Sequence, residues 1–243
     1  VTLADGADVT LATSLYVGRY SGQNGALVVA DGTRIVISEV DGVLFYIGTS
    51  GTGKITQTGG TVEQNDRGAM YIGNNGAYDI SGGTFDQGSL SIGTGAGTGS
   101  VVQTGGDVYA RRDIRMGRYG GTGIYTISGG TLTVNNSSGR DNGYLVVGRD
   151  TEGSSATFNQ SGGIVDALGV QLGREADTAG TYNLSGGELR TPVINAGSGT
   201  AQFHWSGGTI RPRTAGDLAI SMPLTLVGAS ATFDSSDAGG AAR

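Results

Sequence analysis

The stretch Tyr78–Phe85 reads Y-D-I-S-G-G-T-F, and near-copies of it recur throughout the 243-residue chain. The other copies begin at Ile55, Val101, Tyr125, Phe158, Tyr182 and Phe203, and each contains Ser or Thr followed by Gly-Gly. Internal repeats of roughly 20–50 residues are typical of repeat architectures, in which each unit buries its apolar face only against its neighbours. The repeat therefore decides the fold class before any other feature of the sequence.

A second element, apolar-x-apolar-Gly, lies between the Gly-Gly corners. Its glycines are Gly18, Gly48, Gly73, Gly93, Gly117, Gly148, Gly173 and Gly197, which gives units of 20 to 31 residues. Each unit holds three segments in which apolar and polar residues alternate, the pattern of a strand with one buried face. In the segment before the Gly-Gly corner, the expected inward column is Val28, Ile55, Tyr78, Val101, Tyr125, Phe158, Tyr182 and Phe203. The next column towards the corner is Gln57, Ile80, Gln103, Ile127, Gln160, Leu184 and Trp205, and the pattern leaves open whether it lies inside or outside.

Units of 20 to 31 residues with three strands have no room for crossover helices, so successive units must stack with their strands parallel. The sequence therefore predicts an all-β protein, a parallel β-helix (β-solenoid) of about eight to nine turns. A propeller is the alternative, but its blades need four antiparallel strands and about 40 residues each.

Three regions are expected along the coil. Residues 1–42 form divergent N-terminal turns, 43–210 form the regular repeats, and 211–243 form a loosened C-terminal turn and tail. Neither end carries an amphipathic capping helix, and a bare solenoid end is an open sheet edge. We therefore expect end-to-end self-association or continuation of a longer chain. The start at Val1, without methionine, agrees with a segment excised from something longer.

Composition narrows the function classes. The chain has no cysteine, which excludes disulfide frameworks and thiol catalysis, and its 48 glycines fit many short strands joined by tight turns. A net charge of −6 argues against partners such as nucleic acid or an anionic membrane surface. No apolar run reaches the ~18 residues of a membrane span.

The repeat unit resembles a known family. Units such as Y-T-I-S-G-G-T-L from Tyr125, and the closing stretch I-S-M-P-L-T-L-V-G-A-S-A-T-F-D from Ile220, are similar to the autotransporter-associated β-strand repeat proteins. The resemblance covers about residues 15–235. It implies a right-handed parallel β-helix and an extracellular or bacterial cell-surface location. It implies little about the ligand.

Arginine recurs directly after the second-element glycine, and Arg118, Arg149 and Arg174 fall in consecutive units. They could stack as a basic stripe that grips an acidic polysaccharide. The alternative is that Asp150 and Glu175 neutralise them as surface ion pairs. A dense charge cluster at residues 111–118 would also suit a polysaccharide lyase, although fold analogy is a weak basis for an activity.

Tyr46 and Tyr71, with Tyr16, precede the same glycine and face outward. They could form a stacking platform for sugar rings, or simply be strand-forming residues on a solvated face. His204 is expected to face outward as an ordinary strand residue. Calcium is conceivable at Asn65–Asp66 or Asp141–Asn142, but the calcium-binding nonapeptide repeat is absent, so no cofactor is predicted.

The first hypothesis for function is a non-enzymatic extracellular structural protein, a rigid rod, fibre or surface-layer element. The second is an adhesin or polysaccharide-binding module that uses the 135–156 loops together with Arg118, Arg149 and Arg174. The third is a polysaccharide lyase-like enzyme or a glycoside hydrolase.

Overall fold

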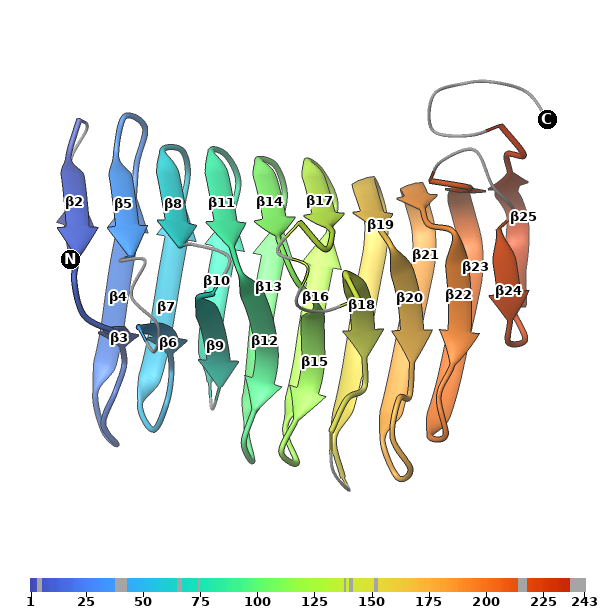
Figure 1. Ribbon diagram of the computed structural model, residues 1–243, viewed down its shortest axis with the longest axis horizontal. Coiled ribbons are helices and arrows are strands. Elements are labelled where there is room, and N and C mark those ends of the chain that lie inside the picture. Colours follow the sequence, from blue (N-terminus) through green and yellow to red (C-terminus); the bar gives the residue numbers. More distant parts are fainter. Residues whose placement is uncertain are drawn as a thin grey trace.

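The computed structural model describes residues 1–3, 6–37, 43–64, 67–73, 75–137, 139, 142–150, 153–213 and 218–236. Within these residues the protein is all-β, and its strands stack side by side along one long axis as a β-solenoid of about nine turns (Figure 1). In Figure 1 the nearer strands run downward and the farther strands upward while the coil advances from left to right, so the coil is right-handed. The predicted fold class is confirmed.

Each full turn contributes strands to three faces of the coil. The long face before the Gly-Gly corner holds β1 (Thr2–Leu3), β4 (Asn24–Val29), β7 (Thr52–Gln57), β10 (Gly76–Ile80), β13 (Thr98–Gln103) and β16 (Thr122–Ile127). After the corner come β2 (Asp8–Leu11), β5 (Arg34–Ile37), β8 (Thr61–Gln64), β11 (Thr84–Gln87), β14 (Asp107–Ala110) and β17 (Thr131–Val134). In the last turns β19 (Ser155–Ala167), β21 (Ala179–Arg190), β23 (Thr200–Arg211) and β25 (Thr225–Phe233) run through the corner and join both faces into one 16-stranded sheet.

The third face is a separate nine-stranded sheet. It consists of β3 (Leu15–Val17), β6 (Leu44–Ile47), β9 (Ala69–Gly73), β12 (Ser89–Thr94), β15 (Ile114–Arg118), β18 (Tyr144–Val147), β20 (Gly169–Leu172), β22 (Val193–Ala196) and β24 (Ala219–Ser221). Neighbouring strands pair in parallel, and equivalent residues of successive turns lie opposite one another. This register turns each sequence column into a row of side chains along the axis.

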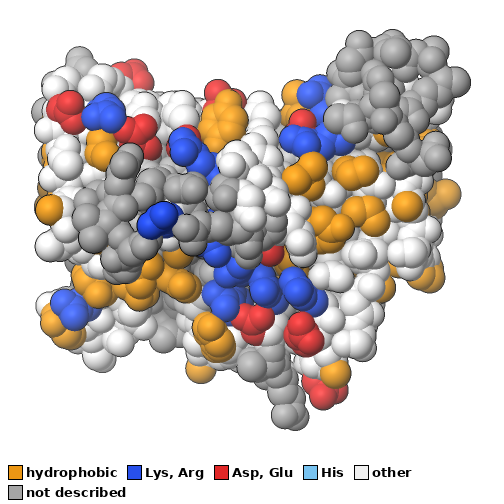
Figure 2. Space-filling model, viewed as in Figure 1, with side chains coloured by type: hydrophobic (Ala, Val, Ile, Leu, Met, Phe, Trp, Pro, Cys, Tyr) orange, Lys and Arg blue, Asp and Glu red, His pale blue; other side chains and the backbone are white. Residues whose placement is uncertain are grey.

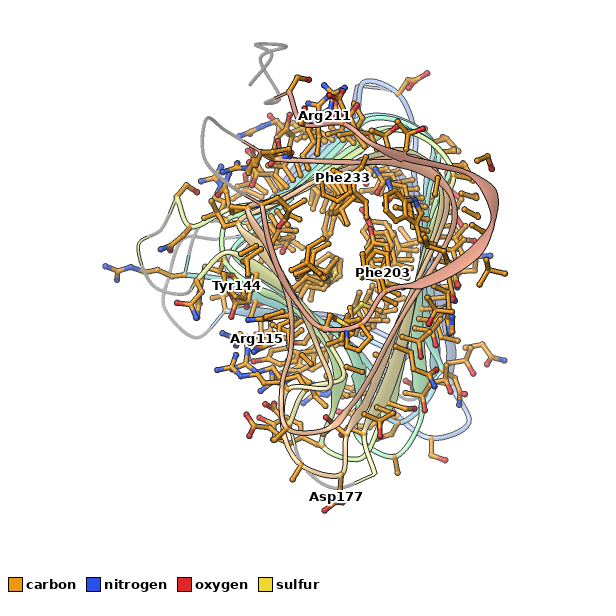
Figure 3. The ribbon with its side chains drawn as sticks, turned by 90° about the vertical axis from the view of Figure 1, so that its right-hand side faces the viewer. Arg115, Tyr144, Asp177, Phe203, Arg211 and Phe233 are labelled. Atoms are coloured by element: carbon orange, nitrogen blue, oxygen red, sulfur yellow. The ribbon has the colours of Figure 1, made fainter. Side chains whose placement is uncertain are left out.

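The core fills the interior of the coil from end to end. The Gln57 column, which the sequence left open, lies inside, because its glutamines are fully buried and Trp205 is 5% exposed. Figure 3 looks along the axis and shows Phe203 among stacked inward side chains. Inside the later turns, Tyr125, Phe158, Tyr182 and Phe203 form a continuous stack with ring centroids 4.8–5.0 Å apart, which matches the spacing of the turns.

One predicted inward residue is wrong. Val28 was expected to face the core, but Leu27 pairs with Ile55 in the register, and Leu27 and Val29 are buried while Val28 faces outward. The first turns lack the Ser/Thr-Gly-Gly corner that fixes the alignment elsewhere. Because strand side chains alternate, an error of one residue moves every side chain to the opposite face.

Buried glutamines alternate with apolar residues from turn to turn. Gln103 accepts a hydrogen bond from the Tyr125 hydroxyl at 2.7 Å, and its amide donates to the carbonyl oxygens of Gly106 and Thr131 at 3.1 and 3.0 Å. Gln160 bonds Tyr182 at 2.6 Å, and Gln57 bonds Tyr78. Each pair joins a glutamine to a tyrosine one turn further on. The structural unit is therefore two turns long.

The constant Gly-Gly corner has a steric cause. In the Thr104-Gly105-Gly106 corner, a Cβ on Gly105 would lie 2.4 Å from the Ser81 carbonyl oxygen of the preceding turn. Gly106 has a φ of +70°, and a Cβ there would meet the Gly83 oxygen at 2.7 Å. The first glycine permits close stacking and the second permits the left-handed turn.

Candidate functional site

The outer surface of the nine-stranded sheet carries most of the residues that the sequence singled out. Its register aligns Tyr16, Tyr46, Tyr71, Ser91, Arg115, Val146, Gln171 and Asn195 in one outward column. The column is aromatic at its N-terminal end. Near its middle, Arg118 and Arg149 lie beside it, at the corner that follows the strands of this sheet. Figure 2 shows this face, with Lys and Arg side chains gathered near its centre and apolar side chains over the earlier strands.

The tyrosines form a ladder. The ring centroids of Tyr16 and Tyr46 lie 4.9 Å apart and those of Tyr46 and Tyr71 lie 5.3 Å apart, with interplanar angles of 9° and 18°. The Arg19 guanidinium covers the Tyr16 ring at 4.2 Å from its centroid. The ring faces inside the ladder thus pack against one another, and the ladder exposes ring edges to solvent. The ladder ends at Tyr71, because Ser91 takes the next place in the register.

Arg118 lies within an ion-pair network rather than on an open stripe. Its Nε donates to Asp150 at 2.5 Å, its Nη1 to the Ser91 hydroxyl at 3.1 Å and its Nη2 to the Tyr119 hydroxyl at 2.9 Å. The residue is only 8% exposed. Its side chain fills the space over Ser91, so Arg118 positions its neighbours more than it offers a free charge.

Arg149 connects two carboxylates. It bonds Asp150 at 3.0 Å from Nε and meets Asp113 at 3.4 Å from Nη1, and Arg115 approaches the same Asp113 oxygen at 3.9 Å. Arg174, in the next turn, pairs with Glu175 at 3.5 Å. The sequence predicted both the consecutive arginines and their acidic neighbours, and the structure brings them together as one network. Arg115 points outward on the left of Figure 3.

Among the residues that the structure describes, four arginines lie beside the three carboxylates of Asp113, Asp150 and Glu175; the arginines are Arg115, Arg118, Arg149 and Arg174. Burial lowers the pKa of Arg149, and the charges of Arg115 and Arg174 lower it further. Burial acts to raise the pKa of Asp150, but hydrogen bonds and charge from Arg118 and Arg149 outweigh it and hold the pKa below its ordinary value. Arginine is thus concentrated at one place on an acidic protein.

A hollow of about 280 Å³ lies between the tyrosine ladder and this network. Its walls include Tyr46, Tyr71 and Tyr119, and its polar groups include Thr49 and Thr94. Glycines at positions 73 and 95 also line it, so backbone is accessible there. The sequence did not single out Tyr119, whose signal is weak: an aromatic residue after the corner arginine, followed by Gly-Gly.

The other candidates lie elsewhere. His204 pairs in register with Asn183 on the outer surface of the 16-stranded sheet, as predicted. Arg111, between β14 and β15, forms a bidentate ion pair at 2.8 and 2.6 Å with Asp86 of the preceding turn. Of the two conceivable calcium sites, Asn65, Asp66 and Asp141 lie outside the described residues. Across the part of the chain that the structure describes, no three His, Asp or Glu side chains gather as a metal site.

No family model, curated protein or solved structure matches this chain. The described residues include no helix long and apolar enough to cross a membrane.

Proposed function

We propose that the protein is a non-enzymatic structural component outside the bacterial cell, a rigid β-helical rod that assembles end to end. The observation that carries this proposal is the core, which runs through about nine stacked turns of parallel strands as one cluster of buried residues. Such a core makes each turn stabilise the next, and the object is stiff along its axis. The extracellular location rests on the family resemblance of the repeat.

Both ends of the described coil support assembly. β1, β2 and β3 are the outermost strands at one end, and β24 and β25 are the outermost strands at the other. At the first end an apolar hollow of about 670 Å³ is lined by Leu3, Leu11 and Leu15, among others. At the second end Leu226 is 65% exposed and Phe233 is 53% exposed. Because all neighbouring strands are parallel, the last turn of one coil can pair with the first turn of another without reversing direction.

Light scattering over a concentration series and negative-stain imaging test this proposal. We expect rods longer than a single coil, and Leu226→Lys should shorten them because it places a charge on the joining surface. Val102→Lys, which changes a 38% exposed residue on the side of the coil, is the matched control and should leave the rods intact. A strictly monomeric protein at every concentration would refute the assembly. Release of reducing ends from polyuronates, with or without calcium, would refute the non-enzymatic assignment.

A second candidate function is polysaccharide binding, as in an adhesin. The observation that favours it is the cluster of arginines beside the tyrosine ladder, on one face of an otherwise acidic protein. Arginine suits carboxylate and sulfate groups because its fork of donors matches their geometry. Glycan-array binding that disappears when Arg149 and Arg174 are replaced together would support this function, and no binding to any glycan would refute it.

A further inference from the structure

We infer that the hollow bounded by Tyr46, Tyr71 and Tyr119 is a subsite for one pyranose ring of an acidic polysaccharide chain, which continues along the coil axis over Arg149 and Arg174. This inference rests on the second proposed function and assigns it a site, a ligand class and a direction.

The corner after the nine-stranded sheet takes a left-handed conformation in four successive turns. Asn75, Gly95, Tyr119 and Asp150 have φ values of 72°, 80°, 54° and 58°. Glycine, asparagine and aspartate tolerate this region, whereas a bulky aromatic residue there is strained. Tyr119 is the exception among the four. Strained residues persist where the surrounding structure holds them, and they concentrate at binding sites.

Arg118 holds the Tyr119 side chain in place. Arg118 donates to the Tyr119 hydroxyl at 2.9 Å, and the Arg118 guanidinium lies 4.7 Å from the Tyr119 ring centroid. Arg118 itself is fixed by Asp150 and Ser91. The Tyr119 ring is nevertheless 57% exposed, so the contacts do not serve to bury it. They fix an exposed aromatic ring at the rim of the hollow.

The opposite wall is also aromatic. Tyr71 has one ring face against Tyr46, and it lines the hollow together with Tyr46 and Thr94. The Arg118 side chain occupies the place over Ser91 where the ladder ends, so the hollow lies beside the ladder, at the corner that follows the strands. Aromatic faces pack against the apolar faces of sugar rings, and threonine hydroxyls and backbone groups suit the hydroxyls at the ring's edge. The hollow thus combines the two kinds of surface that a sugar presents.

Size and charge define the rest of the ligand. A volume of about 280 Å³ is at the lower limit of small-molecule sites, which suits one ring of a longer chain rather than a whole ligand. Arg149 and Arg174 follow Tyr119 by one and two turns, about 5 and 10 Å along the axis. They lie where the next sugar residues of a chain running along the coil would carry carboxylate or sulfate groups. Arginine forks at successive turns match the geometry of carboxylate and sulfate groups, which makes an anionic chain the complementary partner.

Calorimetric titration with tetragalacturonate, a sulfated galactan tetrasaccharide and neutral maltotetraose tests the inference. We expect the two anionic oligosaccharides to bind more tightly than maltotetraose. Tyr119→Gly should weaken their binding at least tenfold without lowering Tm, because glycine relieves the strained φ while removing the ring. Arg149→Gln combined with Arg174→Gln should abolish the preference for anionic over neutral ligands. Tyr109→Ala, which removes a 37% exposed tyrosine from β14 on a different face, is the control and should bind as the unmodified protein does.

The outcomes separate the site from the function. Binding that Tyr119→Gly leaves unchanged, or that Tyr109→Ala reduces equally, would overturn the subsite while polysaccharide binding stands. No binding of any oligosaccharide at millimolar concentration would overturn both. Equal binding of the neutral and anionic ligands would overturn the role given to Arg149 and Arg174.

Discussion

The pair of Gln103 and Tyr125 predicts a specific pattern of stability changes. Both side chains are fully buried, and the Tyr125 hydroxyl donates to Gln103 at 2.7 Å. Tyr125→Phe removes the donor and leaves a buried amide oxygen without that partner, which should cost about 1–3 kcal/mol of unfolding free energy. Gln103→Leu removes the acceptor and strands the tyrosine hydroxyl, at a similar cost. For a chain of this length, 1 kcal/mol corresponds to about 2–4 °C in Tm.

The double variant is the decisive measurement. With both groups replaced, no polar atom of the pair remains unpaired, and the site resembles the turns that carry Ile80 or Leu184 at the same position. We therefore expect the double variant to lose about 1–2 kcal/mol less than the sum of the single variants. Urea unfolding followed by far-ultraviolet circular dichroism measures all three, with the exposed Tyr109→Phe as a neutral control. Effects that add within about 0.5 kcal/mol would refute the coupling.

Three further predictions concern the core and the corners. Burial raises the pKa of Tyr125 above its ordinary value, so the folded state keeps a proton that the unfolded state loses above about pH 10. Tyr125 alone should then lower stability by about 1.4 kcal/mol per pH unit above that pH, and the buried Tyr78 and Tyr182 act in the same direction. Urea midpoints between pH 8 and 11 should therefore fall less in Tyr125→Phe than in the unmodified protein; an equal fall would contradict this. Gly106→Ala should cost about 3 kcal/mol or more of unfolding free energy, because the added Cβ meets backbone of the preceding turn. Gly120→Ala is the control: nothing lies within 4 Å of the added Cβ, so only its left-handed φ should count, at about 1–2 kcal/mol. Equal losses of the two variants in thermal melts would contradict this. Deleting residues 78–124 removes two turns, and the buried glutamine of the turn before then still has a tyrosine beside it. Deleting residues 78–100 removes one turn, and that glutamine then has no tyrosine beside it. The two-turn deletion should therefore unfold more cooperatively and at higher urea concentration despite its greater loss of chain.

The fold was predictable because one sequence feature repeats along the whole chain. The constant Gly-Gly corner fixes the alignment of turns, and where it is missing, in the first 42 residues, the inward residue was misplaced from Leu27 to Val28. The position of the Gln57 column could not be decided from alternation, since a buried amide is acceptable only when its partners are known. Those partners are a tyrosine in the next turn and carbonyl oxygens at the corner. A pattern read within one turn does not contain them.

The candidate site was predictable only in part. The sequence predicted that Tyr46 and Tyr71 face outward, but it left open whether they form a stacking platform for sugars or are ordinary strand residues on a solvated face. Stacking follows from the turn spacing of about 4.8 Å, which is also a favourable distance between aromatic rings. The sequence left open whether Arg118 binds a ligand or pairs with Asp150; the structure pairs it with Asp150 and adds two partners that the pattern did not indicate, Ser91 of the preceding turn and the neighbouring Tyr119. Tyr119 stands out only by its backbone φ angle, and the pattern of residues does not predict that angle.

The two halves of each turn therefore carry different constraints. At the Gly-Gly corner, each turn touches the backbone of the turn before it, so no side chain can be added there without displacing the coil. At the corner after the nine-stranded sheet, the position two residues after the constant glycine holds Asn75, Gly95, Tyr119 and Asp150 in successive turns, and the strands that lead into it stay paired, with one register shift between β9 and β12. Variation is thus tolerated on the second corner because stability is supplied by the first corner and the core. A coil built in this way can change what its outer face binds, one turn at a time, while its axis and its ends stay the same.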